Sequence, residues 1–174
     1  MDFLEVISSF FQSSTDFRNL VTLFPKVELN KPDLKVRRNG KHKYLMFKDE
    51  ILRRTTFKNG NKIEELRFRN GELNGLSEGF YEEGSKRFEN FYTNGKLGHT
   101  VYWYENGVIR LEEDHDSNGK IHGLSTTSNW NGTLKMTVNY LHGRLHGNVT
   151  HYDQNGNFES QVLFINGKAV NETR

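Results

Sequence analysis

Two related stretches decide the fold: residues 94–98 read Asn-Gly-Lys-Leu-Gly, and residues 118–123 read Asn-Gly-Lys-Ile-His-Gly. A type I′ hairpin turn needs positive φ at both central residues, which Asn tolerates and Gly adopts freely, so Asn-Gly predicts a tight turn between two strands. Such dipeptides, with Glu83-Gly84 and His142-Gly143 as variants, begin at positions 59, 70, 83, 94, 106, 118, 131, 142, 155 and 166. The sequence therefore predicts a repeat of about 24 residues with two hairpin turns.

Apolar and polar residues alternate with period two between these turns, which is typical of strands with one apolar and one polar face. A column of rings recurs at matching places on the apolar side, at Tyr92, His115, Tyr140 and Phe164. Strict alternation also assigns Ile109 and Leu111 to this inner, apolar face, and it assigns Phe158 and Ser160 to the same face. A second Gly follows the longer turns, at positions 75, 98, 123 and 147.

The composition agrees with a β-repeat and excludes several other classes. The 174 residues include 16 Gly and a single Ala, Ala169, which argues against a helical bundle. With no Cys, disulfide frameworks, thiolate nucleophiles and cysteine-ligated zinc are excluded. Apolar residues are 34%, aromatic residues 13% and the mean hydropathy is −0.78, so we expect a thin core built largely from rings.

Residues 55–168, and most clearly 94–168, resemble the variant MORN repeat of the bacterial YwqK-type family and of proteins from large DNA viruses. The resemblance implies a mainly β fold: an elongated, twisted antiparallel sheet of stacked β-hairpin repeats, extending over residues 55–174. It also implies a non-enzymatic scaffold or protein-interaction module with an unidentified protein partner. Two alternatives remain, an antitoxin-like inhibitor of the YwqK type and a structural component of a large viral particle.

The N-terminal residues follow a different pattern. Apolar residues at helical spacing over residues 1–25 predict two short helices, read either as a cap on the sheet or as a degenerate F-box-like segment. Residues 26–54 form a basic connecting hairpin within a segment, 26–62, that has 12 Lys and Arg against four acids, a net charge of +8. This surplus of positive charge has two possible explanations. The charges protect an edge hairpin from unwanted pairing, or they form a contact for nucleic acid or anionic lipid.

Two sets of residues are candidate binding sites. On the face assigned to solvent, the early repeats expose rings that predict a protein-binding patch: Tyr81, Phe91, Tyr102 and Tyr104. Packing of the N-terminal helices against these rings is the alternative. The basic turn predicts a polyanion contact at Arg37, Arg38, Lys41 and Lys43.

Three motifs resemble reactive sites, and the repeat explains each of them. Residues 75–79 match the G-x-S-x-G nucleophile elbow but lack the strand-to-helix context. Residues 114–121 match the start of an EF-hand loop, although position twelve is Ser125 in place of Glu. His142 and His146 are four apart but lie in a turn. We therefore expect no catalytic residues, no metal, no cofactor and no small-molecule substrate.

The chain has no apolar run as long as the roughly 18 residues of a membrane span, and residues 1–5 lack a basic leader. We therefore expect a cytoplasmic protein, located in the host cytoplasm or the virion if it is viral. Oligomerisation stays open.

Overall fold

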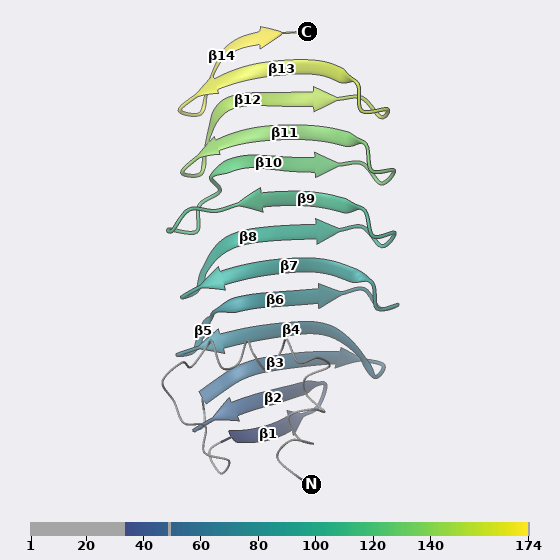
Figure 1. Cartoon of the computed structure of the whole chain (residues 1–174), viewed down its shortest axis with the longest axis vertical. Coiled ribbons are helices and arrows are strands. Elements are labelled where there is room, and N and C mark those ends of the chain that lie inside the picture. The colour runs from purple at the N-terminus through teal and green to yellow at the C-terminus, as the bar shows by residue number, and fades with distance from the viewer. Residues whose placement is uncertain (1–33, 49, 174) are drawn as a thin grey trace.

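The computed structural model describes residues 34–48 and 50–173. These residues form one antiparallel sheet of 14 strands, in which strand order follows the chain except that the short β5 pairs only with β4. Figure 1 shows the strands stacked in sequence order, with β1 and β14 at opposite ends. The predicted mainly β architecture of stacked hairpins is confirmed. The predicted helices over residues 1–25 lie outside the described residues.

The first strands are β1 (Leu34–Asn39), β2 (His42–Phe47), β3 (Glu50–Lys58), β4 (Asn61–Arg69), β5 (Glu72–Leu73), β6 (Gly75–Phe80) and β7 (Lys86–Thr93). The remaining strands are β8 (Lys96–Trp103), β9 (Ile109–Asp114), β10 (Gly123–Ser128), β11 (Leu134–Leu141), β12 (Arg144–Tyr152), β13 (Phe158–Ile165) and β14 (Lys168–Thr173). Because β3 runs from residue 50 to residue 58, the basic hairpin β1–β2 continues into the repeat sheet without a break. None of the described residues forms a helix that is long and apolar enough to span a bilayer.

The connections of the sheet lie on two sides, which from β6 onward differ in turn type except between β9 and β10; the tight turn at Asn59, between β3 and β4, lies on the Gly107 side. On the Asn94 side, to the left in Figure 1, tight turns place positive φ on a non-glycine residue followed by Gly, as at Asn94, His142 and Asn166. On the Gly107 side, to the right, five-residue turns repeat the same pair of backbone hydrogen bonds. In one of them the Tyr104 N–H donates to Val108 O (2.9 Å) and the Gly107 N–H donates to Tyr104 O (3.0 Å). The Asn-Gly periodicity therefore marks the turns on both sides.

Successive side chains of a strand point to opposite faces, and cross-strand partners share a face. We name the two faces after adjacent residues of β7, Tyr92 and Phe91. The predicted ring column, Tyr92, His115, Tyr140 and Phe164, lies on the Tyr92 face. Three of its members pair with the second Gly of a turn: Gly75 with Tyr92, Gly123 with Tyr140 and Gly147 with Phe164.

Small side chains form the buried centre of the Tyr92 face. This row consists of Ser77, Thr100, Ser125, Val138 and Val149, none more than 9% exposed. Neighbouring members are held by the register, since Ser125 pairs with Val138 and Val138 with Val149. Two of the three hydroxyl groups in the row have partners on the same face: Ser125 Oγ donates to Glu113 Oε2 at 3.2 Å, and the Thr100 hydroxyl bonds the Asn90 side chain. The buried Ser77 Oγ has no hydrogen-bond partner among the described residues. Few residues are buried, as predicted, but the expectation of a core built largely from rings is wrong for the described residues. Their buried apolar side chains are all aliphatic: Leu45, Leu52, Val101, Val138 and Val149.

The strict alternation assumed for the strands is wrong where β-bulges occur. A single extra residue follows each turn on the Gly107 side, at Arg87, Arg110, Lys135 and Glu159. An extra residue reverses the faces of the residues before it. Ile109 therefore pairs with Trp103 on the Phe91 face, whereas Leu111 pairs with Tyr102 on the Tyr92 face.

Gly79 illustrates how closely the Tyr92 face is packed. It pairs with Phe88, and a Cβ at this position would overlap the Phe88 ring. That ring is held in turn by the Tyr102 ring, 5.9 Å away between centroids. The second Gly of the G-x-S-x-G match is therefore explained by cross-strand packing.

We predict that Gly79→Ala lowers the free energy of unfolding by about 1–3 kcal/mol, because the added methyl group displaces a packed ring. Urea unfolding followed by circular dichroism measures the change. In a Phe88→Ala background the same substitution should cost markedly less, since the ring is gone. Equal costs in both backgrounds would show that the ring contact is not the cause.

Candidate functional site

The four rings of the predicted protein-binding patch do not share a face. Phe91 pairs with Leu76 and His99 and is 49% exposed. Tyr102 pairs with Phe88, so it lies on the opposite face, among the ring column and the buried row. The prediction that these residues form one solvent-facing patch is therefore wrong in its geometry, because β8 presents Tyr102 to the Tyr92 face.

Tyr81 and Tyr104 connect successive repeats on the Gly107 side. The Tyr81 hydroxyl donates to Trp103 O at 2.8 Å, and the Tyr104 hydroxyl donates to Ser128 O at 3.0 Å. The Tyr104 ring also meets the edge of the Trp130 ring, with centroids 5.2 Å apart. Both tyrosines thus have a structural role that the sequence pattern did not reveal.

A different set of apolar side chains forms a row on the Phe91 face, next to the turns of the Gly107 side. We name it the Trp103 row; its members are Trp103, Ile109, Leu134, Tyr152 and Phe158. Cross-strand pairing brings Trp103 beside Ile109 and Tyr152 beside Phe158. Ile109 is 40% exposed and Phe158 is 53% exposed. The sequence pattern also predicts a column through Trp103 and Tyr152, but strict alternation separated Ile109 and Phe158 from it by assigning them to the inner face with the ring column.

Most of the other strongly exposed apolar residues share this face. Leu124 lies opposite Asn139, and its neighbour Ser125 belongs to the buried row of the other face. Leu141 and Ile165 follow ring-column residues in their strands and so point the same way as Leu124. Within residues 50–173, most of the strongly exposed apolar side chains therefore lie on the Phe91 face.

Carboxylates occupy the centre of the Phe91 face in the early repeats. Glu65 pairs with Glu78, which pairs with Glu89. Cations lie between them: Lys86 Nζ is 3.3 Å from Glu78 Oε1 and also bonds Glu89, and it lies 5.6 Å from the centre of the Trp103 ring. The Trp103 row is thus bordered by a network of paired charges.

Glu65 and Arg53 form the buried end of this network. Their side chains are 8% and 5% exposed, and Arg53 Nη1 donates to Glu65 Oε1 at 3.2 Å. Burial acts to raise the pKa of Glu65, but the charges of Arg53, Lys62 and Arg67 outweigh it and hold the pKa below its usual range. The carboxylate is therefore ionised at neutral pH and stabilises the buried guanidinium.

We predict that Glu65→Gln destabilises the protein at pH 7 by about 3 kcal/mol, because it removes the buried carboxylate that pairs with Arg53, Lys62 and Arg67. A lowered folded-state pKa gives stability that is present above the unfolded value of about 4.3 and is lost as the pH falls through the folded value. The difference between wild type and variant should therefore be constant from pH 5 to 8, on the order of a few kcal/mol, and shrink below about pH 4. Urea unfolding across this range measures it.

Glu112→Gln is the matched control for this experiment. Glu112 lies on the same face, but its side chain is 52% exposed. Surface charges contribute little, so this variant should change stability by less than about 0.5 kcal/mol. A Glu65 variant as mild as the control would contradict the buried pair.

The four basic residues of the predicted polyanion contact are divided between the two faces and the turn. Arg38 pairs directly with Lys43 on the Phe91 face, whereas Arg37 pairs with Tyr44 on the Tyr92 face. Lys41 is exposed in the turn between the strands. Burial, together with the charges of Arg38 and Arg53, lowers the pKa of Lys43. The structure thus concentrates positive charge at Arg38 and Lys43.

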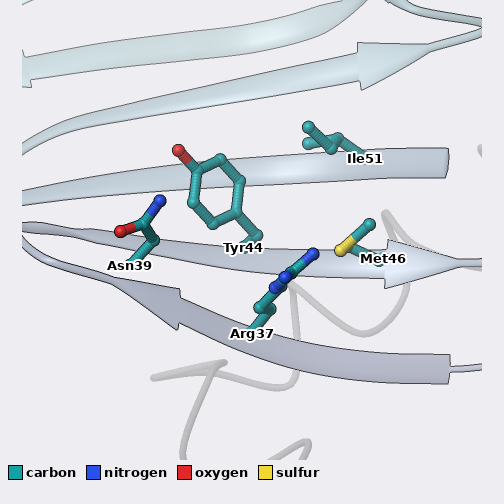
Figure 2. Close-up of a pocket in the computed structure, with 5 residues that line it drawn as sticks. All are labelled: Arg37, Asn39, Tyr44, Met46 and Ile51. Atoms are coloured by element: carbon teal, nitrogen blue, oxygen red, sulfur yellow. The ribbon is translucent and has the colours of Figure 1, made fainter. Parts of the chain in front are cut away.

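A shallow pocket of about 270 Å³ lies on the Tyr92 face of the same hairpin. Figure 2 shows Asn39 and the Tyr44 hydroxyl at one end of the pocket, Met46 and Ile51 at the other, and the Arg37 side chain between the two ends. The sequence reasoning singled out Arg37 but not the other four residues. Their common position follows only from the pairing of β1, β2 and β3.

The structure also places the motifs that resemble reactive sites. Ser77 lies within β6, fully buried, so its hydroxyl is not presented on a nucleophile elbow. His142 and His146 are not brought together as a ligand pair. Instead, the His122 and His142 rings lie 4.7 Å apart, and His142 Nδ1 is 2.7 Å from Asp116 Oδ2.

Comparisons with known proteins give no family assignment, since no family model and no curated protein matches the chain. Accessory secretory protein 1,2 and 3 in Streptococcus pneumoniae is 12% identical, with a TM-score of 0.39, over 60% of this chain and 20% of that one. The GtfA/B complex bound to UDP and GlcNAc is 18% identical, with a TM-score of 0.38, over 64% of this chain and 25% of the matched chain. TarM is 13% identical, with a TM-score of 0.35, over 74% of this chain and 22% of the TarM chain.

This chain thus spans a quarter or less of the length of each of these structures. With TM-scores below 0.5, the three likenesses support no conclusion about this protein's fold or activity.

Proposed function

We propose that this protein is a non-enzymatic protein-interaction module and that it binds its partner through the Trp103 row. The observation that supports this proposal is the exposure of Ile109 and Phe158, beside Trp103 and Tyr152, on one face of the sheet. Burying one Phe or Ile side chain contributes about 1.5–3 kcal/mol. Aromatic side chains of this kind dominate the binding energy of many protein interfaces.

The charges near the row indicate the chemistry of the partner. Glu89 and Glu112 lie on the same face, and the Glu112 side chain is 52% exposed. A partner with an apolar contact surface bordered by Lys or Arg fits this arrangement best, because its cations meet these carboxylates at the rim. The continuous sheet beneath holds the row in one geometry, so little ordering entropy is lost on binding.

We predict that Ile109→Ser combined with Phe158→Ser reduces recovery of the partner by at least about tenfold, which corresponds to a loss of about 1.4 kcal/mol. Affinity purification from the native source with quantitative mass spectrometry measures the recovery. Ile51→Ser is the matched control. The exposed fractions of Ile51 and Ile109 are similar, 37% and 40%, but Ile51 lies on the opposite face at the far end of the sheet. Thermal unfolding verifies that all variants fold.

The outcomes separate the proposal from its alternatives. Loss of one specific protein in the double variant alone supports the proposal, and equal recovery from all variants contradicts it. Recovery of only further copies of this chain would replace it with self-association. Among specific partners, a small toxin would indicate the antitoxin-like role, and particle proteins would indicate the structural role.

Polyanion binding is a second candidate, favoured by the direct pairing of Arg38 with Lys43 on one face. Two neighbouring cations gain by releasing the counterions of a nucleic acid or an anionic surface. Burial is the main cause of the lowered pKa of Lys43, and the neighbouring charges of Arg38 and Arg53 add to it. Nucleic acid and anionic lipid share this chemistry.

We predict that Arg38→Ser with Lys43→Ser lowers the salt concentration at which the protein elutes from heparin, because two phosphate-type contacts are lost. Arg37→Ser, on the opposite face, should shift elution by less than half as much. If the double variant and wild type elute together, the candidate is rejected. If the Arg37 variant shifts as far, the contact is diffuse and does not belong to this pair.

A further inference from the structure

Three side chains able to ligate metals meet on the Asn94 side of the sheet. Asp116 and His122 belong to the connection between β9 and β10, and His142 belongs to the turn between β11 and β12. One ligand atom from each lies within 4.8 Å of the other two. His142 Nδ1 is 2.7 Å from Asp116 Oδ2, and the two imidazole rings are 4.7 Å apart.

The repeat explains why the two histidines are adjacent. The backbone N–H of His142 donates to His122 Nδ1 at 3.4 Å, and the N–H of Asn166 donates to His146 Nδ1 at the same distance one repeat later. Two repeats in the other direction, the N–H of Asn94 donates to Asn74 Oδ1 at 3.0 Å. Asn therefore makes the same hydrogen bond in the other repeats, both at the position of the donor, His142, and at the position of the acceptor, His122.

Asp116 is the residue that distinguishes this repeat from the others. The β9–β10 connection contains a five-residue turn of the kind otherwise seen on the Gly107 side: the Asp116 N–H donates to Lys120 O and the Gly119 N–H donates to Asp116 O, both at 2.8 Å. Asp116 Oδ1 accepts from the N–H groups of Asn118 (2.8 Å) and Lys120 (3.1 Å). These bonds fix the carboxylate and direct Oδ2 to His142.

The electrostatics favour a bound cation. The hydrogen bond from the His142 ring and those from the Lys120 and Asn118 backbone lower the pKa of Asp116 to about 2. Its side chain is 9% exposed, while that of His142 is 63% exposed. A fixed anion therefore stands beside an imidazole that is free to turn.

From this arrangement we infer that Asp116, His122 and His142 form a binding site for a divalent transition metal of the Zn²⁺ class. Two imidazole nitrogens and one carboxylate oxygen are a ligand set that zinc accepts, at roughly 2.0–2.2 Å from the ion, with a fourth position left to water. Such ligands stand roughly 3.3 Å apart around a tetrahedral ion. Rotation of the exposed His142 ring opens the 2.7 Å contact to that spacing.

Metal binding changes one bond in a defined way. In the metal-bound form the neutral His142 ring carries its one proton on Nε2, so Nδ1 and Asp116 Oδ2 no longer share a hydrogen bond and both are available to the ion. The ion then connects two successive turns on one side of the sheet. The role of the site is structural: it adds an ion to the hydrogen bonds that already join these two connections, such as the one from the Gly143 N–H to Ile121 O.

Isothermal titration of the untagged, chelator-treated full chain with Zn²⁺ tests this inference. We expect one ion per chain and a rise in the melting temperature on adding Zn²⁺, because the ion binds the folded state. The variants Asp116→Asn, His122→Asn and His142→Asn should each weaken binding by at least about tenfold and abolish the rise. Asn keeps the turn in each case, as it does in the neighbouring repeats.

Two matched controls come from the repeat itself. His146→Asn alters the residue equivalent to His122, and Asp153→Asn alters a carboxylate that caps its turn through the N–H groups of Asn155 and Asn157, both at 2.8 Å. Both controls should bind Zn²⁺ with wild-type affinity.

No binding by the wild type, or equal binding by all five variants, would overturn the site. Should one of the three site variants fail to fold, judged by its melting temperature without metal, the other two decide the question. In a second measurement, Co²⁺ should give the visible absorption of a low-coordinate site with wild type and with neither His variant.

Discussion

The left-handed backbone at the turns is the constraint on which the sheet depends. Asn59, Asn70, Asn94, His142 and Asn166 all have φ near +50°, and a Gly with positive φ follows each of them. Few side chains tolerate this conformation, so it fixes where a strand can reverse. A shift of one residue in the pairing would exchange the two faces of a strand. Turns at both ends of the strands therefore set the register from β3 to β14.

Within the described residues no second layer packs on the sheet, and the sequence of the strands reflects this. The described strands belong to one sheet, so side chains shield one another mainly along a face. A central row of Ser, Thr and Val achieves burial because small side chains on adjacent strands leave few gaps; Ser77 and Thr100 are 0% and 2% exposed. Tyrosine hydroxyls and Asn side chains then join each turn to the next, as when Asn106 Nδ2 donates to Trp130 O at 2.8 Å. Stability is thus built from contacts between neighbouring repeats.

The sequence was sufficient to predict the turns, the hairpins and the ring column, because each depends on local residue types at a fixed spacing. It was not sufficient to predict the faces near the Gly107 side. The bulges at Arg110 and Glu159 arise from the pairing of two strands, and nothing in either strand alone marks them. As a result, Ile109 and Phe158 were assigned to the inner face and Tyr102 to the outer one. The proximity of Asp116 to His142, 26 residues apart, likewise follows only from strand order.

Departures from the repeat are more informative about function than its regular positions. His122, His146 and Asn74 have the same structural task, so the presence of His at one of them says little about a ligand. Asp153 shows that a carboxylate can cap a five-residue turn without meeting any imidazole, since its Oδ2 accepts from Asn157 Nδ2 at 3.0 Å. Among the described connections, only that between β9 and β10 has a five-residue turn on the Asn94 side, where His122 and His142 lie. The same reasoning applies to the Trp103 row: the bulges that interrupt the alternation are what bring Ile109 and Phe158 to the surface. In this sheet, regular positions maintain the fold, and displaced ones create the surfaces available for binding.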